Sequence, residues 1–131
     1  MSEIEFYKEI LVTIVRPAGK KVSRKMLDDP NATFVWGELM NPHFIEKLLG
    51  SPRAYSPAVA RGFIRKPTKT FFDAVRNPSG AMQGVVLLGL SKKDVDKLNE
   101  FEQVGKVMER HTTEVSIGQM KRKTYIYLKK R

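Results

Sequence analysis

The sequence contains no cysteine among its 131 residues. A chain without cysteine has no disulfide framework, no thiolate nucleophile and no cysteine-based zinc site. It also lacks an apolar run as long as a membrane span, and its first residues lack the basic, apolar and small-residue order of a secretion signal. These features predict a soluble cytoplasmic protein that makes no contact with membranes.

Acidic residues are few compared with basic ones. The chain carries 24 Lys and Arg against 14 Asp and Glu, which gives a formal charge of +10. A basic excess of this size favours contact with a polyanion such as nucleic acid, and it can equally serve solubility. The basic residues are spread along the chain, and no basic run alternates with aromatic residues as in a platform for single-stranded nucleic acid. Nucleic acid therefore stays an alternative partner.

The apolar content of 41% is sufficient for the core of one compact domain. A dense β-branched run at 10–15 predicts a strand, and the polar segment that ends at Asn31 predicts a connector. Residues 1–32 are therefore interpreted as an N-terminal extension made of an added strand and a connector. A loop is predicted at 76–80, where Asn, Pro, Ser and Gly follow one another. Further strands are predicted at 33–36, 58–66, 69–75, 82–90, 110–117 and 123–129.

Two short helices are marked by their capping residues. Asn41 and Pro42 suit a helix start and Gly50 suits its end. Ser91, with Asp94 three residues later, forms a variant capping box for a second helix that runs to about residue 102. The order of elements, mostly strands with two short helices, predicts an α+β fold with a mixed or barrel-like sheet.

Glu102 is the most informative candidate for chemistry. Successive helical residues rotate by about 100°, so Val95, Leu98 and Glu102 lie on one stripe of the second helix. A carboxylate on an inward-facing stripe has a raised pKa because burial disfavours its charged form, and the C-terminal end of the helix dipole acts in the same direction. Such a glutamate is a candidate general base near neutral pH. The alternative is a helix that ends one turn earlier, with Glu102 in solvent or bonded to Arg110.

The segment from Trp36 to Pro42 runs from a strand into a helix. Exposed amides at such a junction bind carboxylate or phosphate oxygens, and Gly37 permits close approach of a ligand, although most turns of this kind bind nothing. The two histidines, His43 and His111, are too far apart in sequence to suggest a zinc site, so no metal is predicted. No phosphate-binding or dinucleotide-binding glycine motif is present.

Five segments lie in a characteristic order along the chain: Phe34–Pro42, Pro57–Arg65, Gln83–Leu88, Leu98–Glu102 and Tyr125–Tyr127. Together they resemble the γ-glutamylcyclotransferase-like superfamily, whose members include AIG2-like and γ-glutamylamine cyclotransferase-like proteins. The chain departs from the family pattern at Glu38, where members carry Ser or Thr, at Gln103, where many carry Gly, and at Met108, where Tyr is frequent. Residues 1–32 have no counterpart in the shortest members.

The resemblance implies a small β-barrel with flanking helices over residues 33–131 and a pocket between the first loop and Glu102. It implies an enzyme that releases 5-oxoproline and an amine from a small γ-glutamyl compound, with Glu102 as general acid and base and without a cofactor. The alternative is a fold relative without catalysis that binds a partner, such as nucleic acid, through its basic surface. Residues 1–32 are expected to add an edge strand or to contact a second subunit. The implied substrate-binding residues are Trp36, Gly37, Glu38, Leu39, Gly84 and Tyr127.

Overall fold

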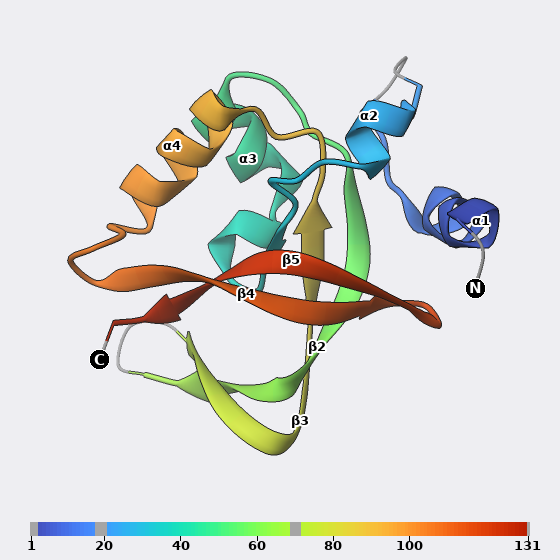
Figure 1. The fold of residues 1–131 in the computed structure, drawn as a ribbon. Helices are drawn as coiled ribbons and strands as arrows, with labels where there is room; N and C mark the ends of the chain where they lie inside the picture. Colours follow the sequence, from blue (N-terminus) through green and yellow to red (C-terminus); the bar gives the residue numbers. More distant parts are fainter. Residues whose placement is uncertain (1–2, 18–20, 69–71, 131) are drawn as a thin grey trace.

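Five strands close into a barrel, and the helices lie outside it (Figure 1). The structure is a computed structural model that describes residues 3–17, 21–68 and 72–130. The order around the barrel is β1-β3-β2-β4-β5, with β1 parallel to β5 and antiparallel to β3, so the sheet is mixed. This confirms the predicted α+β barrel. The strands are β1 (Thr33–Val35), β2 (Tyr55–Pro67), β3 (Phe72–Leu87), β4 (Met108–Ile117) and β5 (Met120–Lys129).

The loop predicted at 76–80 is wrong, because β3 runs through this segment and joins two strands that were predicted separately. Arg61 of β2 pairs with Ala81, and Phe63 pairs with Arg76, so residues 77–80 bulge opposite Gly62 alone. Gly62 has φ +88°, a backbone conformation that glycine adopts at little cost. The turn-forming residues thus form a bulge within a long strand. Part of the strand predicted at 69–75, residues 69–71, lies outside the described residues.

The strand predicted at 10–15 is also wrong. Residues Glu3–Thr13 form helix α1, and the predicted connector contains a second, one-turn helix, α2 (Arg24–Leu27). Ile10 is fully buried and Ile14 packs on the same core cluster, whereas Val12 is 86% exposed. This spacing buries one face of a helix against the barrel, so tertiary packing overrides the β-propensity of the run. A single bridge between Val15 and Tyr55 is the sheet contact of this segment. The division of the chain at residue 32 stays a prediction.

The two predicted helices are confirmed, and they lie side by side at one end of the barrel (Figure 1). In α3 (Pro42–Leu49), the Asn41 side chain accepts a hydrogen bond from the His43 N–H, and Gly50 ends the helix at φ +89°. In α4 (Lys92–Phe101), the capping box of Ser91 and Asp94 is formed in both directions. A short 3-10 helix, η1 (Glu38–Met40), precedes α3. Among the described helices, none is long and apolar enough to cross a membrane.

Candidate active site

A cavity of about 900 Å³ opens between the segment that follows β1 and the end of α4. Its lining includes every residue predicted for the site except Gly84. The predicted residues that it brings together are Trp36, Gly37, Glu38, Leu39, Glu102 and Tyr127. The lining residues that were not predicted for the site are Phe34, Val35, Met40, Arg65, Asp73, Phe101, Gln103, Val107 and Met108.

The first wall of the cavity is the segment Trp36–Met40. The indole of Trp36 donates a hydrogen bond to the Tyr127 carbonyl oxygen at 3.2 Å, which ties the segment to β5. The carbonyl groups of Gly37 and Glu38 accept from Met40 and Asn41 at the start of the next helix. Within the described residues, the N–H groups of residues 37–39 have no hydrogen-bond partner. These N–H groups are free to bind oxygen atoms of a ligand, as the first amides of a helix often do.

Glu102 forms the opposite wall. It follows the last residue of α4, and its N–H donates to the carbonyl of the fully buried Leu98, so the predicted stripe is confirmed. Its side chain is half-buried, and the carboxylate has no hydrogen-bond partner among the described residues. Burial, followed by the negative charge of Glu38, raises the pKa of Glu102 to about 7. The alternative bond to Arg110 is not formed, because that guanidinium contacts Tyr127 and Thr33.

Tyr127 lines the same cavity as Glu102 and belongs to a hydrogen-bonded network. Its hydroxyl donates to Asn99 Oδ1 at 2.8 Å and accepts from Arg110 Nη1 at 2.7 Å. Burial raises the pKa of Tyr127 to about 12, with Glu102 acting in the same direction and the Arg110 charge against it. The hydroxyl is therefore neutral at physiological pH, with both hydrogen bonds directed at protein groups. These two hydrogen bonds hold the Tyr127 hydroxyl in place.

Arg65 is a lining residue that the sequence argument missed. From β2, its Nε and Nη2 donate to the Trp36 carbonyl oxygen at 3.1 and 2.7 Å, and Nη2 also donates to the Gln83 carbonyl oxygen at 2.7 Å. The spacing from Phe63 was an available signal, because residues i and i+2 of a strand share a face and Phe63 is buried.

Gly84 does not line the cavity. A Cβ atom at this position would lie 2.5 Å from both the Phe34 ring and the Val35 carbonyl oxygen. Its role is therefore to let β1 and its aromatic side chain approach β3 closely.

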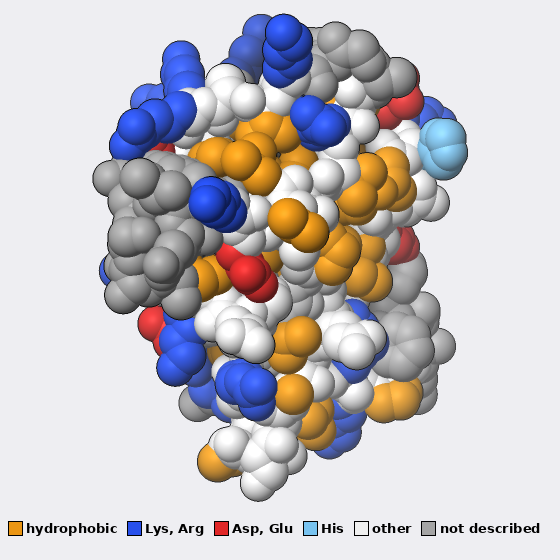
Figure 2. Space-filling view, turned by 90° about the vertical axis from the view of Figure 1, so that its right-hand side faces the viewer, with side chains coloured by type: hydrophobic (Ala, Val, Ile, Leu, Met, Phe, Trp, Pro, Cys, Tyr) orange, Lys and Arg blue, Asp and Glu red, His pale blue; other side chains and the backbone are white. Residues whose placement is uncertain are grey.

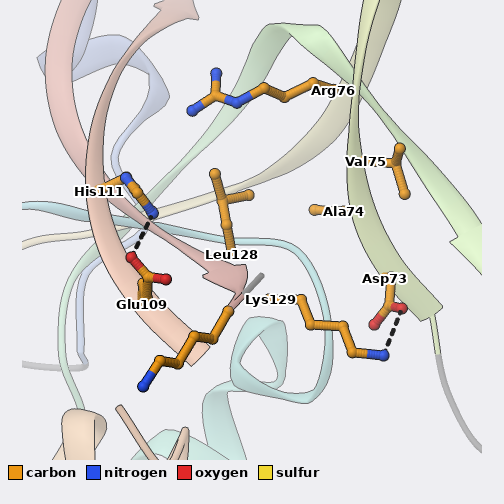
Figure 3. A pocket seen from close by; sticks show the side chains of 9 residues that line it. Asp73, Ala74, Val75, Arg76, Glu109, His111, Leu128 and Lys129 are labelled. Atoms are coloured by element: carbon orange, nitrogen blue, oxygen red, sulfur yellow. Dashed lines mark ion pairs between the residues drawn. The ribbon is translucent and has the colours of Figure 1, made fainter. Parts of the chain in front are cut away.

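A second cavity, of about 510 Å³, is lined by residues of β3, β4 and β5 (Figure 3). Asp73 lines both cavities and pairs with Lys129 at 3.9 Å. His111 also lines the second cavity, where its Nε2 lies 3.5 Å from a carboxylate oxygen of Glu109. Across the described part of the chain, no three His, Asp or Glu side chains are grouped in a way that could hold a metal ion.

The chain was compared with known protein families and with solved structures. Residues 33–131 match the family described as gamma-glutamyl cyclotransferase, AIG2-like. A search of curated proteins found no match.

Similar folds occur in solved structures from several sources. The Arabidopsis thaliana protein At5g39720.1 is 23% identical with a TM-score of 0.68, over 76% of this chain and 68% of that one. The protein At3g28950.1 of the same plant is 27% identical with a TM-score of 0.68, over 76% of this chain and 61% of that one. A structure named gamma-glutamyl cyclotransferase is 17% identical with a TM-score of 0.66, over 77% of this chain and 67% of that one. These structures share the fold, and the match of the family model over residues 33–131 shows that the chain belongs to the gamma-glutamyl cyclotransferase, AIG2-like family.

Proposed function

We propose that the protein is a cyclotransferase that converts a small γ-glutamyl compound into 5-oxoproline and a free amine. The observation that carries this proposal is one cavity lined by Glu102 and by residues 37–39. Among the described residues, neither the Glu102 carboxylate nor the N–H groups of residues 37–39 have a hydrogen-bond partner. A group with a pKa of about 7 both accepts and donates a proton readily at neutral pH. Membership of the family supports the same reaction class.

The reaction is an internal acyl transfer. Glu102 takes one proton from the α-ammonium group, and the free amine attacks the γ-carbonyl carbon of the same molecule. A new C–N bond closes the five-membered ring, and the N–H groups of residues 37–39 stabilise the oxyanion that develops on the carbonyl oxygen. Glu102 then returns its proton to the leaving nitrogen as the original C–N bond breaks. The ring nitrogen also gives up its second proton, which the released amine takes up, so the products are neutral lactam and an ammonium ion. The atoms balance without any further reactant.

The test is release of 5-oxoproline from γ-glutamyl amino acids, γ-glutamyl amines and glutathione. Wild type should release it from at least one of these compounds, and Glu102→Gln should lower the rate about a thousandfold, as is typical when a general base is removed. Glu100→Gln is the matched control, since Glu100 is exposed on the same helix and does not line the cavity. Absence of release by a folded wild-type protein, or full activity of Glu102→Gln, would contradict the proposal.

Nucleic-acid binding is the alternative that the same protein sample can test. On the face that Figure 2 shows, Lys and Arg side chains lie in separate groups around hydrophobic side chains and form no continuous stripe. Binding of a labelled oligonucleotide that weakens steeply with added salt, and is unaffected by Glu102→Gln, would favour the binding function.

A further inference from the structure

The cavity presents a charge problem for the proposed substrate. A γ-glutamyl compound carries an α-carboxylate, and the cavity lining carries the carboxylates of Glu38, Glu102 and Asp73. Asp73 is offset by its ion pair with Lys129, but Glu38 and Glu102 have no ion-pair partner in the described part of the chain. Negative charges that line one cavity disfavour binding of the substrate carboxylate unless a cation lies nearby.

Arg65 is the one cation among the described residues that line the cavity. Its Nε and Nη2 atoms are held by two backbone carbonyl oxygens, those of Trp36 and Gln83. An arginine has five N–H donors in a rigid fork, and here the two on Nη1 have no partner in the residues that the structure describes. The guanidinium is therefore fixed in place while one end stays free to bind an anion.

We propose that Arg65 binds the α-carboxylate of the glutamyl group. This inference rests on the proposed function and divides the polar groups of the cavity between two tasks. Arg65 takes the carboxylate, and the N–H groups of residues 37–39 are left for the oxyanion. The α-ammonium group is attached to the same carbon as the carboxylate, and the carboxylates of Glu38 and Glu102 then surround it. Glu38 thus faces a positive charge on the substrate.

The proposal restricts the substrate to γ-amides that carry an α-carboxylate. A matched compound without this group is a 4-aminobutyryl amide, which closes by the same reaction to 2-pyrrolidinone. Arg65→Met should lower kcat/KM for the γ-glutamyl amide about a hundredfold, mainly through KM, because hydrogen bonds between two charged groups are lost. The loss for the 4-aminobutyryl amide should be less than about fivefold.

Two further variants separate binding from a structural role. Arg61→Met removes an exposed arginine of the same strand outside the cavity and should leave both rates unchanged. Arg65→Lys keeps the charge but not the planar fork, so it should recover only a part of the lost activity. If Arg65 serves only to hold the Trp36 carbonyl, Arg65→Met will lower both rates by the same factor. Such an equal loss, or no loss, overturns the proposal.

A binding measurement distinguishes failure of this inference from failure of the proposed function. Chemical shifts of the backbone amides are followed by NMR as 5-oxoproline or 2-pyrrolidinone is added to wild type and to Arg65→Met. The substitution should weaken 5-oxoproline binding at least about tenfold and leave 2-pyrrolidinone binding unchanged. This result without any turnover would support the role of Arg65 in binding and contradict the cyclotransferase activity. Equal binding of 5-oxoproline by both proteins would overturn the role of Arg65.

Discussion

Helix α4 carries a carboxylate at each end, and the two have opposite surroundings. Asp94, in the first turn, is 5% exposed and accepts hydrogen bonds from Arg53 at 2.8 and 3.1 Å and from the Ser91 N–H at 3.0 Å. Glu102, just past the last turn, is half-buried and accepts no hydrogen bond from the described residues. The two ends of one short helix therefore hold one fully bonded carboxylate and one carboxylate to which the described residues donate no hydrogen bond.

The pKa values of the two groups diverge for this reason. Burial raises the pKa of Asp94, but the hydrogen bonds from Arg53 and Ser91 and the charge of Arg53 outweigh it and hold the pKa below its usual value. Burial also raises the pKa of Glu102, and there the nearby Glu38 adds to the effect. The helix dipole acts in the same sense, since it favours negative charge at the N-terminus and disfavours it at the C-terminus. Burial of a carboxylate alone thus does not distinguish a structural group from a reactive one; its partners do.

The largest difference is expected when each carboxylate is replaced by its amide. Asp94→Asn should lower the free energy of unfolding by about 3 kcal/mol at pH 7, because it leaves the mostly buried Arg53 guanidinium without a counter-charge. Glu102→Gln should not lower it, since no hydrogen bond within the described residues is lost. Urea unfolding of the two variants beside wild type measures both effects. An equal loss of stability in both variants would show that Glu102 is also a structural group.

The pH dependence of the free energy of unfolding should also distinguish Glu102 from Asp94, with a smaller change than the amide substitutions produce. The pKa of Glu102 is about 7 in the folded state against 4.5 for the free side chain, so folding is favoured most below pH 4.5 and this contribution is lost as the pH rises to about 7. The loss should be about 2 kcal/mol in wild type, since solvent in the cavity screens part of the effect, and absent in Glu102→Gln.

Asp94 should show the opposite sign. Its pKa is lowered from 3.8, so its contribution is present above that pH and is lost as the pH falls through the lower value of the folded state. Thermal unfolding of wild type and both amide variants between pH 3 and pH 8 measures the two trends. A difference between wild type and Glu102→Gln that does not change with pH would contradict the raised pKa.

The parts of the fold that sequence predicts are those with local signals. The capping residues of α3 and α4 determine where these helices begin, because their side chains bond to amides only two or three residues away. The run at 10–15 carries a local signal for a strand, but burial of Ile10 against the distant barrel makes it a helix. The residues at 76–80 carry a turn signal that the opposite strand converts into a bulge. In both failures, contacts between residues far apart in sequence override the local preference.

The same distinction holds in the site. Glu102 was predicted because its position follows from the period of one helix. Arg65 and Asp73 reach the cavity from β2 and β3, and their positions depend on the pairing of these strands with each other and of β3 with β1, which lies far away in sequence. The resemblance alone predicts Gly84 in the pocket. In the structure a glycine is needed there because a side chain would collide with Phe34 on the paired strand β1.

The smallest expected effect concerns the origin of the raised pKa. Glu38→Ser removes the second cause of the shift and leaves burial, the larger cause, in place. The pKa of Glu102 should therefore fall but stay above 4.5, and the pH at which turnover reaches half its maximum should fall with it. Carbon-13 NMR of the labelled Glu102 carboxyl group measures this pKa without any substrate. Glu46→Ser, on the exposed face of α3 outside the cavity, should leave it unchanged. A fall to the value of a free side chain would show that Glu38, and not burial, makes Glu102 differ from Asp94.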